Sequence, residues 1–310
     1  FLIITATLLL NVCMTMASDF DFIFSDSTLR IDYIFSGNAD VQMISVKEIK
    51  KSPHWAGRRT NLQTVPLDGN GDITIYDAST NDVLYKNSFS SLFQEWLSTP
   101  EAMETNRSFE FTLLVPKPHS KVVAEVVLRN NKNQATATFR HTIMPNDVLI
   151  KDMTAQKPEP YKYLHKAGNP NECIDIAIVA EGYTKKEMKH FLKDAQTAAD
   201  EILSYEPFSR YADKINFVAV MCPSIDTDVS PPQDNSWKQT AINSNFMTFY
   251  SPRYLTTNSI HTLHDRLANI PYEHIIVLAN TYTYGGGGIY NSLTLTTTHH
   301  ESFKPVVVHE

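Results

Sequence analysis

The chain has 310 residues, of which 42% are hydrophobic and 20% are charged, and its formal net charge is −7. Length and composition are those of a folded protein with about two domains, and they exclude a disordered chain, a collagen-like repeat and a disulfide-stapled miniprotein. The acidic balance offers no basic surface, so we expect no nucleic-acid partner.

The first 17 residues have the features of a targeting segment. They carry no charge, begin with the apolar stretch 1–10, and end in the small-x-small sequence Thr15-Met16-Ala17. This pattern predicts part of a signal peptide over residues 1–17 and export of the mature protein, and the apolar run is too short for a membrane span. Cys13 is the candidate for a lipid anchor, but the Val before it fits that alternative poorly, so we expect export without lipidation.

Residues 18–145 place hydrophobic side chains at every second position. In the first such segment, Leu29, Ile31, Tyr33 and Phe35 alternate with the charged residues Arg30 and Asp32. Similar short segments follow, separated by turn sequences such as Asp-Gly-Asn-Gly at 68–71, with no convincing amphipathic helix among them. This pattern predicts an antiparallel β-sandwich, a module that usually packs or binds rather than catalyses.

A segment with several prolines, residues 146–170, is predicted to link this domain to a second one over 171–310. After the linker the period changes. A buried strand at 174–180 precedes a helix with one apolar face, and a capping box of Thr184 and Glu187 marks where that helix begins.

A second strand at 215–221, a helix over 260–270 and a third strand at 274–279 complete the alternation. Strand, helix, strand, helix, strand predicts an α/β domain with a mainly parallel sheet. The whole chain is therefore expected to be of the α+β class with two domains.

A long polar stretch, 223–258, separates the second strand from the second helix. It contains the aromatic residues Trp237, Phe246, Phe249 and Tyr250. Loops of this length in a compact domain are usually functional or ordered over a site. These aromatic side chains either contact substrate or, as is more common, anchor the loop.

Glycine is scarce, with 10 residues in the chain, yet four of them form one run, Gly285, Gly286, Gly287 and Gly288. The run lacks the Gly-Lys-Ser/Thr ending of a phosphate-binding loop, so that use is excluded. It remains either a flexible linker or a backbone surface that something approaches closely. Tyr284 and Tyr290 on its two sides disfavour the linker.

The segment 289–297 reads as a strand with one solvated face, because Leu293 and Leu295 alternate with threonines. Such a strand is expected at the edge of the sheet, where an extended peptide can add as a further strand. The alternative is an ordinary sheet margin without a partner.

His309-Glu310 supplies the first two letters of H-E-x-x-H, in which two His one helical turn apart hold Zn²⁺ and the Glu polarises the bound water. Pro305 is well placed for the first turn of a helix that carries His309. The alternative is a short buried strand over 306–308. A second pair, His300-Glu301, continues as Ser-Phe-Lys and fails the motif.

The chain resembles the IgA-specific metallopeptidase family in three segments taken together. They are Ile-Val-Ala-Glu-Gly-Tyr-Thr at 178–184, the glycine run with its flanks at 284–291, and Val-Val-Val-His-Glu at 306–310. These are secreted bacterial zinc peptidases with an N-terminal β-sandwich before a zincin-type catalytic domain. The resemblance spans 21–310 in the same domain order. At Glu181 the family more often has Asp.

The resemblance implies that His309 is the first Zn²⁺ ligand and Glu310 the general acid/base of an endopeptidase acting on extracellular proteins. The family's second His and acidic ligand have no counterpart among the 310 residues, so we expect a zincin-like domain that is incomplete and a fragment that is inactive alone. The glycine run and Tyr290 are expected to bind the peptide substrate. Secretion, or a periplasmic or cell-surface location in a bacterium, is implied.

Two roles stay open. Tyr284 or Tyr290 could support the oxyanion, and His299 and His300 could reach the metal, although solvated residues at a sheet edge are the more common case. The competing hypothesis is a secreted two-domain protein without catalysis that binds glycan or protein through the sandwich and the long aromatic loop. An x-x-His continuation after Glu310 would separate the two hypotheses.

Overall fold

The computed structural model describes residues 19–65 and 67–310. The predicted signal peptide and Cys13 lie outside the described residues. In the described part, no helix is both long and apolar enough to cross a membrane.

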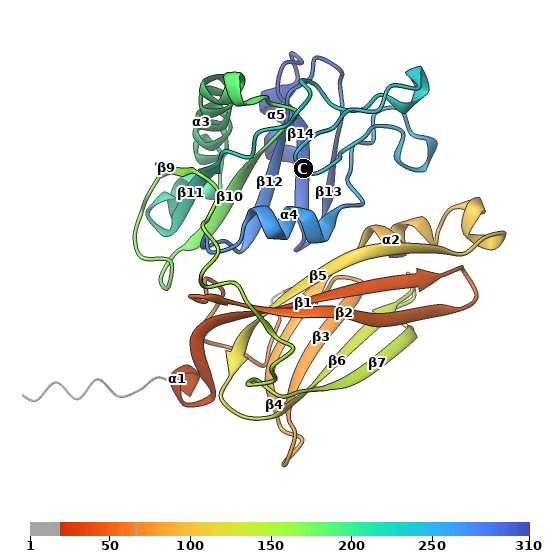
Figure 1. Cartoon of the computed structure of the whole chain (residues 1–310), viewed down its shortest axis with the longest axis vertical. Helices are drawn as coiled ribbons and strands as arrows, with labels where there is room; N and C mark the ends of the chain where they lie inside the picture. Colours follow the sequence, from red (N-terminus) through yellow and green to blue (C-terminus); the bar gives the residue numbers. More distant parts are fainter. Residues whose placement is uncertain (1–18, 66) are drawn as a thin grey trace, which may run out of the picture.

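The N-terminal part consists of two four-stranded sheets packed face to face (Figure 1). One has the order β5-β1-β2-β8 and the other β4-β3-β6-β7, and all pairs are antiparallel except β2 with β8. The elements are α1 (Asp19–Ile23), β1 (Phe24–Gly37), β2 (Gln42–Pro53), β3 (Gly71–Asp77), β4 (Val83–Phe89), α2 (Leu92–Trp96), η1 (Pro100–Met103), β5 (Arg107–Pro118), β6 (Val122–Arg129), β7 (Ala135–Ile143) and β8 (Lys151–Asp152).

The period-two pattern of the first strand is confirmed. The side chains of Leu29, Ile31, Tyr33 and Phe35 in β1 are fully buried between the two sheets. The polar residues between them are buried as well: Arg30 is 5% exposed and Asp32 is 0% exposed. Arg30 and Asp32 lie on the outer face of this sheet, and the C-terminal part of the chain covers that face. The alternation of hydrophobic and polar residues in β1 therefore does not mark a solvated face.

The C-terminal part is built on one six-stranded sheet of order β13-β14-β12-β10-β11-β9. Strands β10, β11, β12 and β14 are parallel, and the antiparallel strands β9 and β13 form the two edges. The elements are β9 (Tyr161–His165), β10 (Ile174–Glu181), η2 (Lys185–Glu187), α3 (Met188–Ser204), η3 (Phe208–Lys214), β11 (Ile215–Val220), η4 (Pro232–Asp234), η5 (Thr248–Tyr250), α4 (Ile260–Arg266), β12 (His274–Ala279), β13 (Gly286–Ile289), β14 (Leu293–Thr297) and α5 (Phe303–His309).

These elements confirm a mixed α+β chain. The segment 146–170, expected to be a linker, contributes β8 to a sheet of the N-terminal part and β9 to the six-stranded sheet. Helix α3 begins where the capping box predicts, after one 3₁₀ turn, and the backbone N–H of Thr184 donates to Glu187 Oε2 at 2.8 Å.

Two apolar cores cover the two faces of the six-stranded sheet. Helices α3 and α5 pack on one face, while α4 and the long loop 223–258 pack on the other. Helix α4 lies between this sheet and the outer face of β1, β2 and β5 (Figure 1). There Arg30 donates to Asp265 Oδ1 at 2.7 Å and to the carbonyl of His261 at 2.8 Å, which joins the two parts.

The prediction that 289–297 forms the edge strand is wrong. Strand β14 lies inside the sheet, between β12 and β13, and the edge is formed by β13, which contains three of the four glycines. The threonines of β14 alternate with leucines because one face packs on each core, and Thr296 and Thr297 are buried.

Candidate active site at the glycine strand

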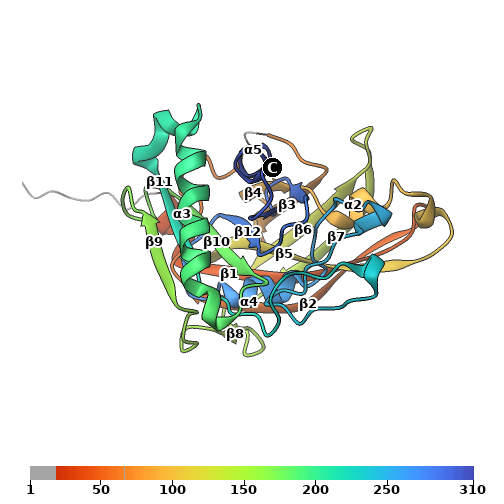
Figure 2. The ribbon, with the colours of Figure 1, turned by 90° about the horizontal axis from the view of Figure 1, so that it is seen from above.

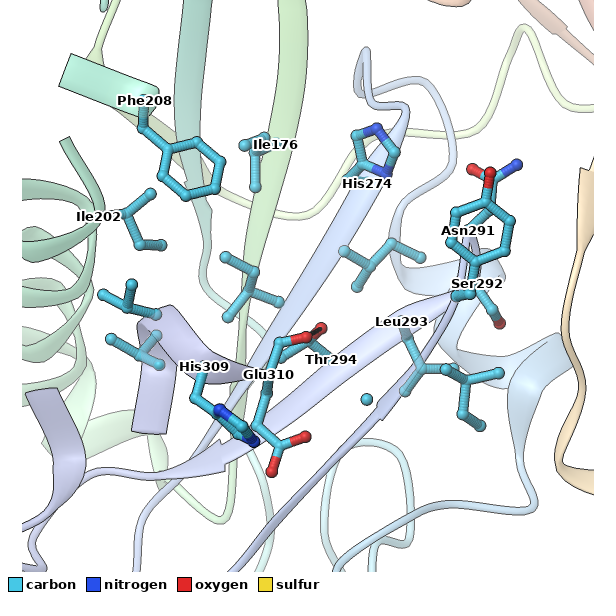
Figure 3. Close-up of a pocket in the computed structure, with 17 residues that line it drawn as sticks. Ile176, Ile202, Phe208, His274, Asn291, Ser292, Leu293, Thr294, His309 and Glu310 are labelled. Carbon is cyan, nitrogen blue, oxygen red and sulfur yellow. Dashed lines mark hydrogen bonds between the residues drawn. The ribbon is translucent and has the colours of Figure 1, made fainter. Parts of the chain in front are cut away.

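Helix α5 brings His309 and Glu310 to the glycine strand. The helix begins after Ser302, has Pro305 in its first turn and buries Phe303 and Val307 against the sheet. The alternative of a short buried strand at 306–308 is therefore wrong. Figure 3 shows the side chains of His309 and Glu310 projecting together beside β14.

The glycines of β13 leave room for Glu310. A Cβ at residue 286 would stand 3.0 Å from Glu310 Oε1, and a Cβ at residue 288 would stand 2.9 Å from the Glu310 carbonyl oxygen. Because alternate residues of a strand face opposite sides, Gly286 and Gly288 share the face toward α5. Glycine at these positions lets the end of the helix contact the strand backbone.

The other two glycines meet the long loop. A Cβ at residue 285 would come within 2.6 Å of Phe246 Cε1, and one at 287 within 2.5 Å of Tyr254 Cε2. The interpretation of the run as a closely approached backbone is confirmed, although the groups that approach it in this structure belong to the chain itself.

A cavity of about 540 Å³ opens between the glycine strand, α5 and the long loop. Its lining residues are Glu95, Ser251, Arg253, Tyr254, Tyr284, Gly285 to Gly288, Val306, His309 and Glu310. A second cavity of about 750 Å³ lies on the other side of His309 and Glu310. It is lined in part by apolar residues such as Ile202 and Phe208 and in part by polar ones such as His274 (Figure 3). The His-Glu pair thus stands where the two cavities meet.

Burial raises the pKa of the Glu310 carboxyl, against the opposing influence of His309, Arg253 and the backbone N–H of Gly288. A carboxylate with a raised pKa is the better proton acceptor at neutral pH. Among residues 19–65 and 67–310 no group of three or more His, Cys, Asp or Glu side chains is placed to hold a metal ion. His309 by itself does not meet the ligand requirement of zinc, which takes three or four protein ligands.

The flanking tyrosines differ in position. Tyr284 lines the glycine cavity, and its ring lies 5.1 Å from that of His300. Tyr290 does not line that cavity: its hydroxyl donates to the carbonyl of Leu67 in the N-terminal part at 2.8 Å. His299 is held by Asn280, whose Oδ1 lies 2.8 Å from His299 Nε2.

Four residues of the cavity were not anticipated from the sequence: Glu95, Ser251, Arg253 and Tyr254. Tyr254 belongs to the long loop whose aromatic residues suggested a functional segment. Glu95 lies in α2 of the N-terminal part, and no sequence pattern around it indicates a functional role. Of the aromatic residues named for that loop, Phe246 is buried and anchors it, whereas Trp237 and Tyr250 are largely exposed.

The long loop is attached to the sheet by Glu181, at the end of β10. This carboxylate is fully buried and accepts hydrogen bonds from the hydroxyls of Thr240 and Ser244 and from the backbone N–H groups of Ile242 and Ser244. Burial raises its pKa, and the four donors oppose that change. Glu181 therefore anchors the loop that forms one side of the cavity.

Two family models match the chain. Residues 19–140 match the model described as Peptidase M64 N-terminus, and residues 163–310 match the model described as IgA Peptidase M64. The chain belongs to the IgA peptidase M64 family. No curated protein matches the sequence.

Family membership confirms the resemblance read from the three segments. M64 proteins are metallopeptidases, so the supported activity is metal-dependent hydrolysis of a protein substrate. Both matched regions carry part of the cavity, because Glu95 comes from the M64 N-terminus and the glycine strand from the M64 peptidase region.

Proposed function

We propose that this M64 chain carries the glycine strand and the first half of the zinc site of a zincin-like endopeptidase that cleaves extracellular proteins. The observation that carries the proposal is the position of His309 and Glu310 at the end of α5, in contact with Gly286 and Gly288. His309 is the first ligand in this proposal and Glu310 the general acid/base. The described residues do not by themselves fit a zinc ion, because they supply one ligand of the motif.

When bound in such a site, zinc supplies a polarised water and an electrophile for the scissile carbonyl. The chain's own contribution is made by Glu310 and the strand. Glu310 would take a proton from the attacking water and pass it to the leaving amine, a role that its raised pKa favours. The glycine backbone keeps side chains out of the cavity, so a peptide backbone can approach the carboxylate.

Secretion, or a periplasmic or cell-surface location in a bacterium, remains part of the proposal and rests on the signal-peptide pattern of residues 1–17. The 310 residues alone are proposed to be inactive as a peptidase, since an H-E-x-x-H site needs a second His and a further ligand.

The first test is the coding sequence beyond Glu310. An x-x-His continuation is expected, and another residue in the position of that His would contradict the zinc assignment. The second test is metal analysis of the 310-residue chain, in which we expect weak binding well below one zinc per chain. Tight stoichiometric zinc would show that His309 is not the first ligand of an incomplete set.

The third test uses the two His-Glu pairs as a matched comparison in a chain that carries the completed motif. Glu310→Gln should lower hydrolysis of fluorescein-labelled casein by about 100-fold or more. Glu301→Gln alters the exposed carboxylate of the second pair and should leave the rate unchanged. Equal effects of the two substitutions would contradict the assignment and favour a binding protein without catalysis.

A further inference from the structure

The N-terminal domain contacts the glycine strand at one end. The backbone N–H of Ser90 donates to the carbonyl of Tyr290 at 3.0 Å, directly after β13. Asn291 Nδ2 donates to the carbonyl of Ser88 at 2.6 Å, and Tyr290 donates to Leu67. The outward-facing carbonyl of Tyr290 is thus already paired with the N-terminal domain.

At the other end of β13 the contact is made through Tyr254. The backbone N–H of Leu255 donates to the carbonyl of Gly286, and the N–H of Gly286 donates to the carbonyl of Arg253, both at 3.2 Å. The Tyr254 hydroxyl donates to Glu95 Oε2 of α2 at 2.5 Å. Figure 2, viewed from above, shows α2 and the long loop on the same side of the molecule.

The pairing of β13 with β14 decides which backbone groups of β13 remain available to a further strand. The N–H of Thr297 donates to the carbonyl of Gly285, so Gly285, Gly287 and Ile289 direct their backbone groups toward β14 in an antiparallel ladder. The groups of Gly286, Gly288 and Tyr290 then point outward. The ends are occupied by segment 253–255 and by Ser90. Between them the outer edge is left at Gly288, whose N–H donates to the Glu310 carboxyl and whose carbonyl accepts no backbone hydrogen bond from the described residues.

We propose that the N-terminal domain is one wall of the peptide groove, and that Glu95 is a positioning residue that holds Tyr254 and segment 253–255 on the outer edge of β13. A substrate peptide then pairs with β13 over about one residue, at Gly288, instead of adding as a full strand. The inference rests on the proposed function for the identity of the ligand. It assigns the β-sandwich a direct part in substrate selection, favouring a short extended segment over a long β-strand.

Hydrogen exchange in the 310-residue chain tests the positioning step. Glu95→Ala and Tyr254→Phe each remove the same hydrogen bond and should raise the exchange rates of the Leu255 and Gly286 amides by about tenfold, with no further increase in the double variant. Glu95→Gln keeps an acceptor and should restore most of the protection. Tyr76→Phe is the matched control, because Tyr76 donates to Glu125 in the same way, at 3.0 Å, inside the N-terminal domain. Unchanged exchange in Glu95→Ala, additive effects, or an equal effect of Tyr76→Phe would overturn the inference.

Nuclear magnetic resonance with tryptic peptides of casein tests the groove. In the wild-type chain the peptides should shift the Gly288 amide and leave Gly286 and Tyr290 in place, and in Glu95→Ala the shifts should extend to Gly286. Shifts over the whole strand in the wild type would overturn the inference. If the peptides shift no amide resonance of β13 in any variant, both the proposed peptide site and the groove built on it are wrong. The hydrogen-exchange rates of Leu255 and Gly286 then still decide whether Glu95 positions the loop.

Discussion

The ring of Tyr254 lies against the backbone of Gly287, so closely that a Cβ at residue 287 would stand 2.5 Å from Tyr254 Cε2 and 2.8 Å from the carbonyl oxygen of Leu255. This contact brings the long loop, the edge strand and, through Glu95, the N-terminal domain to one point. It explains why a residue without a side chain is needed in the third position of the run.

Gly287→Ala should therefore lower the free energy of unfolding by about 1–3 kcal/mol, the usual cost of inserting a methyl group where no space exists. Gly168→Ala is the comparison, because there the nearest neighbour is the Cys173 side chain at 3.0 Å. Urea unfolding measures both changes. A loss no larger in Gly287→Ala than in Gly168→Ala would show that Tyr254 and the loop move aside freely.

Asp32 is the centre of a buried charge cluster between the two parts of the chain. It accepts two hydrogen bonds from the Arg30 guanidinium, at 2.7 and 2.8 Å, and lies 3.4 Å from Lys50 Nζ. Asp32→Asn should cost about 3–5 kcal/mol of unfolding free energy, because it leaves buried cations without their carboxylate.

The control for this prediction is Glu206→Gln, which breaks the exposed ion pair with Arg210 and should change the stability by about 0–1 kcal/mol. Denaturant unfolding monitored by fluorescence gives both values. If the two substitutions cost the same, Asp265, which also accepts from Arg30 and Lys50, is sufficient to balance the cluster.

Glu273 makes the stability depend on pH. Burial raises the pKa of its carboxyl from 4.5 to about 8. The unfolded chain ionises this group at a lower pH than the folded chain does, so the stability that the protonated form contributes is present below pH 4.5 and is lost as the pH rises to about 8.

Glu273→Gln removes this dependence. The melting temperature of the variant relative to wild type should therefore be higher at about pH 9 than at about pH 5. Glu172→Gln, at an exposed position, serves as control. Its melting temperature should differ from that of the wild type by the same amount at both pH values. A pH-independent effect of Glu273→Gln would contradict the raised pKa.

Glu181→Gln should loosen the long loop. The substituted amide presents an NH₂ group to donors that now bond to the carboxylate, and each buried donor left without an acceptor costs about 1–3 kcal/mol. Limited proteolysis should then cut near residues 240–244 at a raised rate. Asp226→Asn, which changes the acceptor of the Gln239 N–H in the same loop, is expected to have a smaller effect. Equal cleavage in wild type and Glu181→Gln would show that the loop is held by Phe246 and its neighbours instead.

Local sequence patterns predicted several secondary-structure elements of this protein and its family. Alternation in β1, the capping box before α3 and Pro305 before His309 predicted their elements correctly, because strand faces, helix starts and first turns depend on residues two to four positions apart. The segments that resemble the M64 family identified the family for the same reason, as each is a short contiguous run.

Only the tertiary structure decided which strand is the edge, why Arg30 and Asp32 are buried, and that Glu95 reaches Tyr254, 159 positions later in the chain. The glycine run shows the difference between the two levels. Because glycine is scarce in the rest of the chain, the run was predicted to be a backbone that another group approaches closely. The groups that approach it, Phe246, Tyr254 and Glu310, come from separate elements. Which of them meet depends on how two apolar cores and a charged interface pack together, and no local periodicity records that packing.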